Sequence, residues 1–171
     1  MSKLIMLDHL SAETCERLVS IYAKNKLGAH KWETDNPNQP MYPLDFKAIL
    51  NDDDFLWDVV NEVLELVCFH FGDLEVEWGE IVYRLKDCSS GWHFDTQSKN
   101  TAITSVTYLT DNFEGGETCF IDGTKVKPLV GRTIIFDGNY YKHMVAASSD
   151  TRFAMPIWYK QKERTCNTST M

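Results

Sequence analysis

The 171-residue sequence has no long apolar run, no CxxC pair, and little glycine or proline. A membrane-spanning helix needs roughly 18 consecutive apolar residues, and Asp8 and His9 interrupt the apolar N-terminal segment too early for a signal peptide. The five cysteines are scattered and odd in number, which predicts neither a disulfide framework nor a zinc knuckle. These absences exclude secreted mini-proteins and membrane spans. We therefore expect a cytoplasmic protein without membrane contact.

Basic residues are also scarce, since 17 Lys and Arg face 25 Asp and Glu for a formal net charge of -8. Such a surface repels polyphosphate, so we expect no nucleic-acid partner, although a local basic groove stays compatible with the composition. Hydrophobic residues make up 43% of the chain, enough for one core. We predict a single domain over residues 1–171, with a helical buttress at about 1–72, a β core at about 73–160 and a polar tail at 161–171.

The first third of the chain predicts two helices separated by a loop. Ser11 is a suitable N-cap for a first helix that ends near 26–28, because apolar residues follow it at helical spacing. Three prolines in residues 31–47 predict a long loop. The acidic cluster at 51–54 begins a second apolar helix, which Gly72 ends.

The remainder of the chain reads as short strands separated by turn signals. The expected strands are 76–85, 92–96, 102–110, 117–121, 124–127, 132–136, 142–147 and 152–160. Many short strands behind two helices indicate a mainly β, α+β fold in which a sandwich or jelly roll is buttressed by about two helices.

The segment from Gly91 to Asp95 offers a metal site. On a strand, His93 and Asp95 project to one side while Trp92 and Phe94 project to the other. A neighbouring imidazole and carboxylate are costly inside a protein unless an ion occupies them. Two histidines and one carboxylate on one face of a metal are typical of non-haem Fe(II) oxygenases. The pattern HxD alone is a weak motif, because it occurs by chance in many chains as a pair on the surface or in a turn.

Further elements follow in order along the chain. His143 lies on a predicted strand, and Arg152 stands nine residues later at the start of the last strand. Arginine is permanently charged and forked, which suits it to binding a carboxylate through two hydrogen bonds. Between the HxD segment and His143 come the sequences FEGGETCF at 113–120 and KPLVGRTIIF at 127–136.

Over residues 80 to 160, this ordered set resembles the prolyl 4-hydroxylase-like Fe(II)/2-oxoglutarate dioxygenases. The family's catalytic unit is a double-stranded β-helix, a jelly-roll barrel buttressed by N-terminal helices. The resemblance implies Fe(II), 2-oxoglutarate as cosubstrate and dioxygen, with ascorbate as a reductant. It also implies a reaction in which oxidative decarboxylation of 2-oxoglutarate to succinate and CO2 is coupled to hydroxylation of a C–H bond.

Carried over to this sequence, the resemblance implies that His93, Asp95 and His143 hold the iron. Arg152 would then pair with the distal C5 carboxylate of 2-oxoglutarate, although it stands one residue closer to the histidine than the family pattern; Arg132 is a rival on another strand. Two further donors to that carboxylate are implied. Thr118 matches the GGET threonine, and Tyr83 stands ten residues before His93 where nine is usual. For both residues, packing within a strand is the alternative.

The substrate is less defined by the sequence. The resemblance implies a peptide or protein substrate, with peptidyl proline first, and a free amino acid or other small molecule as the alternative. Recognition loops are expected at 29–47 and 84–92. Two functions of another class stay open. One is a non-catalytic jelly-roll binding module. The other is a cupin-like metalloenzyme that does not use 2-oxoglutarate.

Overall fold

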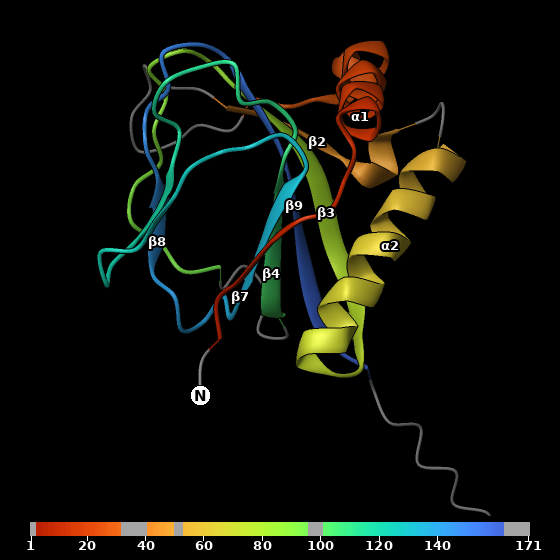
Figure 1. Cartoon of the computed structure of the whole chain (residues 1–171). Coiled ribbons are helices and arrows are strands. Elements are labelled where there is room, and N and C mark those ends of the chain that lie inside the picture. The colour runs from red at the N-terminus through yellow and green to blue at the C-terminus, as the bar shows by residue number, and fades with distance from the viewer. Residues whose placement is uncertain (1–2, 32–40, 50–52, 96–100, 163–171) are drawn as a thin grey trace, which may run out of the picture.

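The computed structural model describes residues 3–31, 41–49, 53–95 and 101–162 (Figure 1). Its helices are α1 (Ala12–Asn25) and α2 (Asp53–Phe71), with short 3-10 helices η1 (Lys26–Gly28) and η2 (Phe46–Ala48). Its strands are β1 (Ile5–Asp8), β2 (Met41–Asp45), β3 (Leu74–Arg84), β4 (Thr101–Tyr108), β5 (Thr118–Phe120), β6 (Lys125–Val126), β7 (Arg132–Phe136), β8 (His143–Val145) and β9 (Arg152–Gln161). Neither helix is long and apolar enough to span a membrane within these ranges.

Both predicted helices form, and the predicted acidic start of the second helix at 51–54 lies partly outside the described residues. The Ser11 hydroxyl accepts a hydrogen bond from the backbone N–H of Thr14 at 3.0 Å, which caps the first turn of α1. At the end of α2, Gly72 has a φ of +90°, and its N–H donates to the carbonyl of Cys68. A residue without a side chain adopts this left-handed conformation at little cost, so the helix ends there.

The strands form two antiparallel sheets that face each other (Figure 1). The larger sheet has the order β1-β7-β4-β9-β3-β2, and the smaller has the order β6-β5-β8. Between the sheets, the rings of Phe120 and Phe136 pack edge to face with their centroids 5.2 Å apart. Two facing sheets with the helices outside the larger one confirm the predicted mainly β jelly roll.

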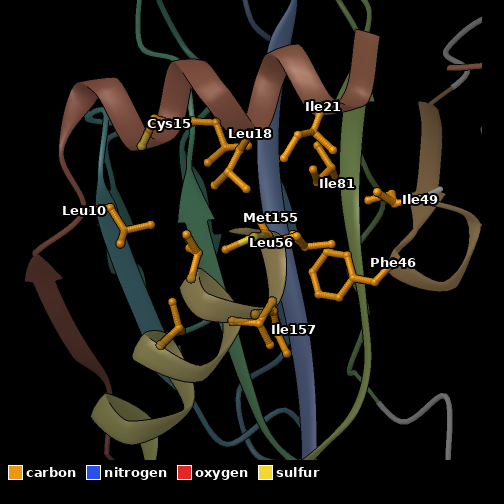
Figure 2. Close-up of a cluster of buried hydrophobic side chains, with 14 of the residues drawn as sticks. Leu10, Cys15, Leu18, Ile21, Phe46, Ile49, Leu56, Ile81, Met155 and Ile157 are labelled. Atoms are coloured by element: carbon orange, nitrogen blue, oxygen red, sulfur yellow. The ribbon is translucent and has the colours of Figure 1, made fainter. Parts of the chain in front are cut away.

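The main apolar core lies between the larger sheet and the two helices. Figure 2 shows Leu18 and Ile21 of α1 and Leu56 of α2 directed at the sheet, where Ile81 and Ile157 meet them. All five of these side chains are fully buried. At roughly 2 kcal/mol for each fully buried aliphatic side chain, this layer holds the helices on the sheet. The opposite face of the same sheet is therefore free to line a site.

Two strands were missed by the sequence analysis. β1 pairs with β7, and β2 occupies residues 41–45, so the expectation of a loop over 31–47 is wrong for that part. Pro43 gave the misleading signal. It fits here because β2 is the edge strand of the sheet, where a missing backbone N–H costs no ladder hydrogen bond. Residues 32–40 of the expected loop, and the predicted tail from 163 onward, lie outside the described residues.

Candidate metal centre and its pocket

Three side chains from the predicted set converge at one point. One ligand atom from each of His93, Asp95 and His143 lies within 4.8 Å of the others. The Asp95 carboxylate is 3.7 Å from Nε2 of His93 and 3.8 Å from Nε2 of His143. These separations are too long for hydrogen bonds but short enough for one ion to bridge the three atoms. The sequence-predicted triad is therefore assembled in the fold.

Backbone pairing brings the two histidines together. His93 and His143 form an isolated antiparallel bridge, in which each N–H donates to the other residue's carbonyl at 2.9 Å. The expected strand 92–96 is wrong to this extent, because the described part of the segment pairs only at His93. The predicted alternation nevertheless holds, since the ligand atoms of His93 and Asp95 converge on one point while the side chains of Trp92 and Phe94 are exposed.

The histidine rings are oriented by backbone carbonyls. Nδ1 of His93 lies 2.8 Å from the carbonyl of Gly91, and Nδ1 of His143 lies 3.0 Å from the carbonyl of Tyr141. If Nδ1 carries the proton, each ring donates there and presents the Nε2 lone pair to its partner ligands. Burial, the largest effect, lowers the pKa of His143, with Asp95 opposing and His93 adding to it. This favours the neutral imidazole that a metal requires.

The donor set fits Fe(II). Two imidazoles and one carboxylate arranged on one side leave the remaining positions of an octahedral ion open for other ligands. Asp95 is itself held in place, because its backbone N–H donates to the carbonyl of Gly138 at 3.0 Å. Of the residues the structure describes, only these three form a cluster of His, Cys, Asp or Glu with this geometry.

A cavity of about 100 Å³ opens beside the triad. A single water needs roughly 10–15 Å³ by the same kind of measure, so the cavity is large enough for a small organic ligand. His93, Asp95, His143, Thr118 and Arg152 all line it. The structure thus brings five of the six predicted site residues to one pocket.

Arg152 begins β9 as expected and is 3% exposed. Its Nε and Nη2 have no hydrogen-bond partner within the described ranges. Burial lowers the pKa of Arg152 to about 10, and the neighbouring Tyr108 opposes that shift. Tyr108 in turn donates from its hydroxyl to Oγ1 of Thr118 at 2.7 Å. The three side chains form a buried, positively charged end of the pocket that can receive a carboxylate.

A second arginine that the sequence analysis did not single out lies at the same end. Arg84 and Arg152 are paired across β3 and β9, and both line the pocket. Nη1 of Arg84 donates to the Sγ of Cys88 at 4.0 Å, and burial lowers the pKa of Arg84. In the part of the chain that the structure describes, neither guanidinium forms an ion pair with a carboxylate.

Tyr83 does not reach the pocket. Its ring packs against Tyr22 of α1 and Phe153 of β9, on the helix-covered face of the sheet. Successive strand residues point to opposite faces, so the pocket-facing residue is Arg84, nine positions before His93. The expected role of Tyr83 at the cosubstrate is therefore wrong, and the alternative of strand packing is right.

Arg132 is placed away from the pocket as well. Its Nε and Nη2 donate to the two carboxylate oxygens of Asp8 at 2.7 and 3.0 Å, which ties β7 to β1. A guanidinium held in this bidentate pair has its charge compensated. Of the two candidate arginines, Arg152 is therefore the one placed to bind a carboxylate in the pocket.

Three more pocket residues come from the far end of β3 and β9. Glu80, Trp78 and Trp158 line the cavity, and the two indole rings stack with centroids 4.6 Å apart. Alternation along β3 puts Trp78, Glu80 and Arg84 on one face and Ile81 on the other, but the sequence did not show which of these faces lines a pocket.

Comparison with solved structures adds the next observation. A 2OG-Fe(II) oxygenase family oxidoreductase from Burkholderia pseudomallei matches 94% of this chain and 88% of its own, with a TM-score of 0.77 and 17% identity. A prolyl-4-hydroxylase from Pseudomonas putida matches 95% of each chain, with a TM-score of 0.73 and 15% identity. The alpha-ketoglutarate-dependent epimerase SnoN of nogalamycin biosynthesis matches 94% of this chain and 77% of its own, with a TM-score of 0.75 and 13% identity.

The chain has the 2-oxoglutarate/Fe(II) oxygenase fold. This confirms the predicted double-stranded β-helix and the architecture that the sequence resemblance implied. No protein-family model and no curated protein matches the sequence. Because one of these neighbours is an epimerase, the oxygenase fold does not by itself specify the reaction.

Proposed function

We propose that the protein is an Fe(II)- and 2-oxoglutarate-dependent dioxygenase that hydroxylates a C–H bond of its substrate. The observation that carries this proposal is the pocket itself, in which His93, Asp95 and His143 lie beside the buried and uncompensated Arg152. A metal site and a carboxylate site in one cavity match the two functional ends of 2-oxoglutarate.

Each residue has a defined role in this proposal. His93, Asp95 and His143 hold Fe(II), and Arg152 binds the C5 carboxylate with Tyr108 and Thr118 beside it. When bound, iron with 2-oxoglutarate and dioxygen supplies the oxidising chemistry, which yields succinate, CO2 and a hydroxylated product. The apolar lining, including Val82, Val106 and Ala154, excludes water from the reacting centre.

Peptidyl proline is the substrate we propose first. The sequence resemblance and the prolyl-4-hydroxylase of Pseudomonas putida among the structural neighbours support it. A free amino acid or another small molecule is the second candidate, because the cavity is small and buried side chains such as Glu80 and Arg152 line it. Ascorbate would serve as a reductant of the iron.

The test is an anaerobic titration of the metal-free protein with Fe(II) and 2-oxoglutarate, following the visible charge-transfer band of the chelate. We expect wild type to give the band, His143→Ala to lose metal binding, and Arg152→Ala to weaken 2-oxoglutarate binding by about a hundredfold. Arg132→Ala is the matched control, because it removes a guanidinium paired with Asp8 outside the pocket. It should leave the band unchanged.

The same titration separates the other classes. Metal binding without a band in wild type would contradict the use of 2-oxoglutarate and favour a cupin-like metalloenzyme. Absence of metal binding would leave a non-catalytic jelly-roll module.

A further inference from the structure

Glu80 is a buried acid without a partner. Its side chain lines the pocket from β3, the residue is 3% exposed, and Oε1 has no hydrogen-bond partner among the described residues. Burial, the larger effect, and the nearby Asp45 raise the pKa of Glu80 to about 7. An unsatisfied buried carboxyl destabilises a fold, so its position in a cavity indicates a ligand that satisfies it.

Two indole N–H groups beside Glu80 are also buried without a hydrogen-bond partner among the described residues. Trp78 lies two residues before Glu80 on the same face of β3, and its Cα partner on β9 is Trp158. Nε1 of each ring is buried and has no acceptor within the described part of the chain. The pocket therefore contains, at one end, an acid and two N–H donors that no protein group satisfies.

The cosubstrate cannot be the ligand that satisfies Glu80. 2-Oxoglutarate is anionic at both ends, and the positive groups that suit it are the metal site and the arginine pair Arg84 and Arg152. Glu80 stands four residues from Arg84 on the same strand, a separation of roughly 13 Å. The pocket is thus divided by charge, with cations at the end for 2-oxoglutarate and an acid at the other end.

We propose that Glu80, Trp78 and Trp158 form the subsite for the substrate that is oxidised, and that this substrate carries an ammonium group which pairs with Glu80. A carboxylate next to indole rings is a combination that attracts organic cations. The indole N–H groups donate to oxygen atoms of the same molecule. That this ligand is the substrate to be oxidised rests on the proposed function. The binding of an ammonium group is inferred from Glu80 and the two indoles alone.

The experiment observes the indole N–H signals of 15N-labelled protein during titration with n-butylammonium, and with 1-butanol as its uncharged counterpart. The chain has five tryptophans, so Trp78→Phe and Trp158→Phe assign the two relevant signals. We expect n-butylammonium to shift both signals and to bind about tenfold or more tightly than 1-butanol. Glu80→Gln should remove that preference, because it keeps the shape of the side chain without its charge.

Glu75→Gln is the matched control. Glu75 lies on the same strand, but it is half-buried and pairs with Lys160 at 3.0 Å outside the pocket. This variant should retain the preference for n-butylammonium. Equal affinity for the two probes in wild type, an unchanged preference in Glu80→Gln, or no shift of either indole signal overturns the proposal.

The proposed function is tested separately on the same variants. Glu80→Gln should still give the charge-transfer band with Fe(II) and 2-oxoglutarate, which also shows that the variant is folded. A missing band in wild type with an intact n-butylammonium preference would remove the oxygenase assignment and leave the subsite. Titration with L-proline and L-lysine on one side, and an N-acetylated, C-amidated Pro-Lys peptide on the other, then shows whether the ammonium belongs to a free amino acid or to a peptide side chain.

Discussion

The two faces of the larger sheet differ sharply although the same strands make both. On the helix-covered face, β3 and β9 contribute Ile81, Met155 and Ile157, which are fully buried against apolar side chains (Figure 2). On the pocket face, the same strands hold Glu80 and Arg152, and Oε1 of Glu80 and Nε and Nη2 of Arg152 lack partners in the described structure. Because side chains alternate along these two strands, the residues that stabilise the fold lie on one face and the unpaired polar groups lie on the other.

The two faces contribute to the stability of the folded state with opposite signs. Burial of the apolar layer beneath the helices stabilises the folded state. Burial of uncompensated charge on the pocket face destabilises it. Such polar groups persist where ligands satisfy them. Substitutions on the two faces should therefore have opposite effects on the stability of the ligand-free protein.

The largest effect is expected on the helix face. Ile157→Ala removes fully buried methyl groups and leaves a cavity, so it should lower the free energy of unfolding by about 3–4 kcal/mol. Urea unfolding of the metal-free protein measures this loss. A loss below about 1 kcal/mol would contradict the claim that this face carries the stability of the fold.

Arg152→Met should act in the opposite direction. It replaces a buried, uncompensated charge with an apolar side chain of similar length, and we expect the ligand-free protein to gain about 2–3 kcal/mol while it loses 2-oxoglutarate binding. Differential scanning calorimetry with and without 2-oxoglutarate gives both quantities. Destabilisation in the absence of ligand would mean that Arg152 stabilises the fold. It would contradict the claim that the two faces have opposite effects on stability.

The smallest of these effects depends on pH. Because the folded-state pKa of Glu80 is raised to about 7 from an ordinary 4.5, the folded protein binds more protons than the unfolded chain between these values. Stability from the neutral acid is present at low pH and is lost as the pH rises through 7. Glu80→Gln should therefore gain about 2 kcal/mol relative to wild type between pH 5 and pH 8, as measured by urea unfolding. A difference that does not change with pH would contradict the burial of an unpaired carboxyl.

The sequence predicted the parts of the site that depend on local pattern. Strand alternation placed His93 and Asp95 on one side, and both line the pocket while Trp92 and Phe94 do not. The helices, with their Ser11 and Gly72 boundaries, are confirmed as well, since capping and helical periodicity are local properties.

The parts of the site that the sequence did not predict depend on which face of a strand packs against the helices and which face lines the pocket. β3 carries apolar and polar residues on both faces, so its pattern alone did not show that Tyr83 packs under α1 while Arg84 enters the pocket. Glu80 gave no signal either, because a single acid in a strand normally lies at the surface. Pro43 concealed β2, whose edge position becomes visible only when the whole sheet is assembled.

The central claim is that one pocket holds a metal on three side chains and a diacid on Arg152. A crystal structure of the protein grown anaerobically with Mn(II) and 2-oxoglutarate tests it most directly. We expect the metal on Nε2 of His93, Nε2 of His143 and the Asp95 carboxylate, with the C5 carboxylate of 2-oxoglutarate on Arg152. A metal bound elsewhere, or 2-oxoglutarate outside this pocket, would contradict it.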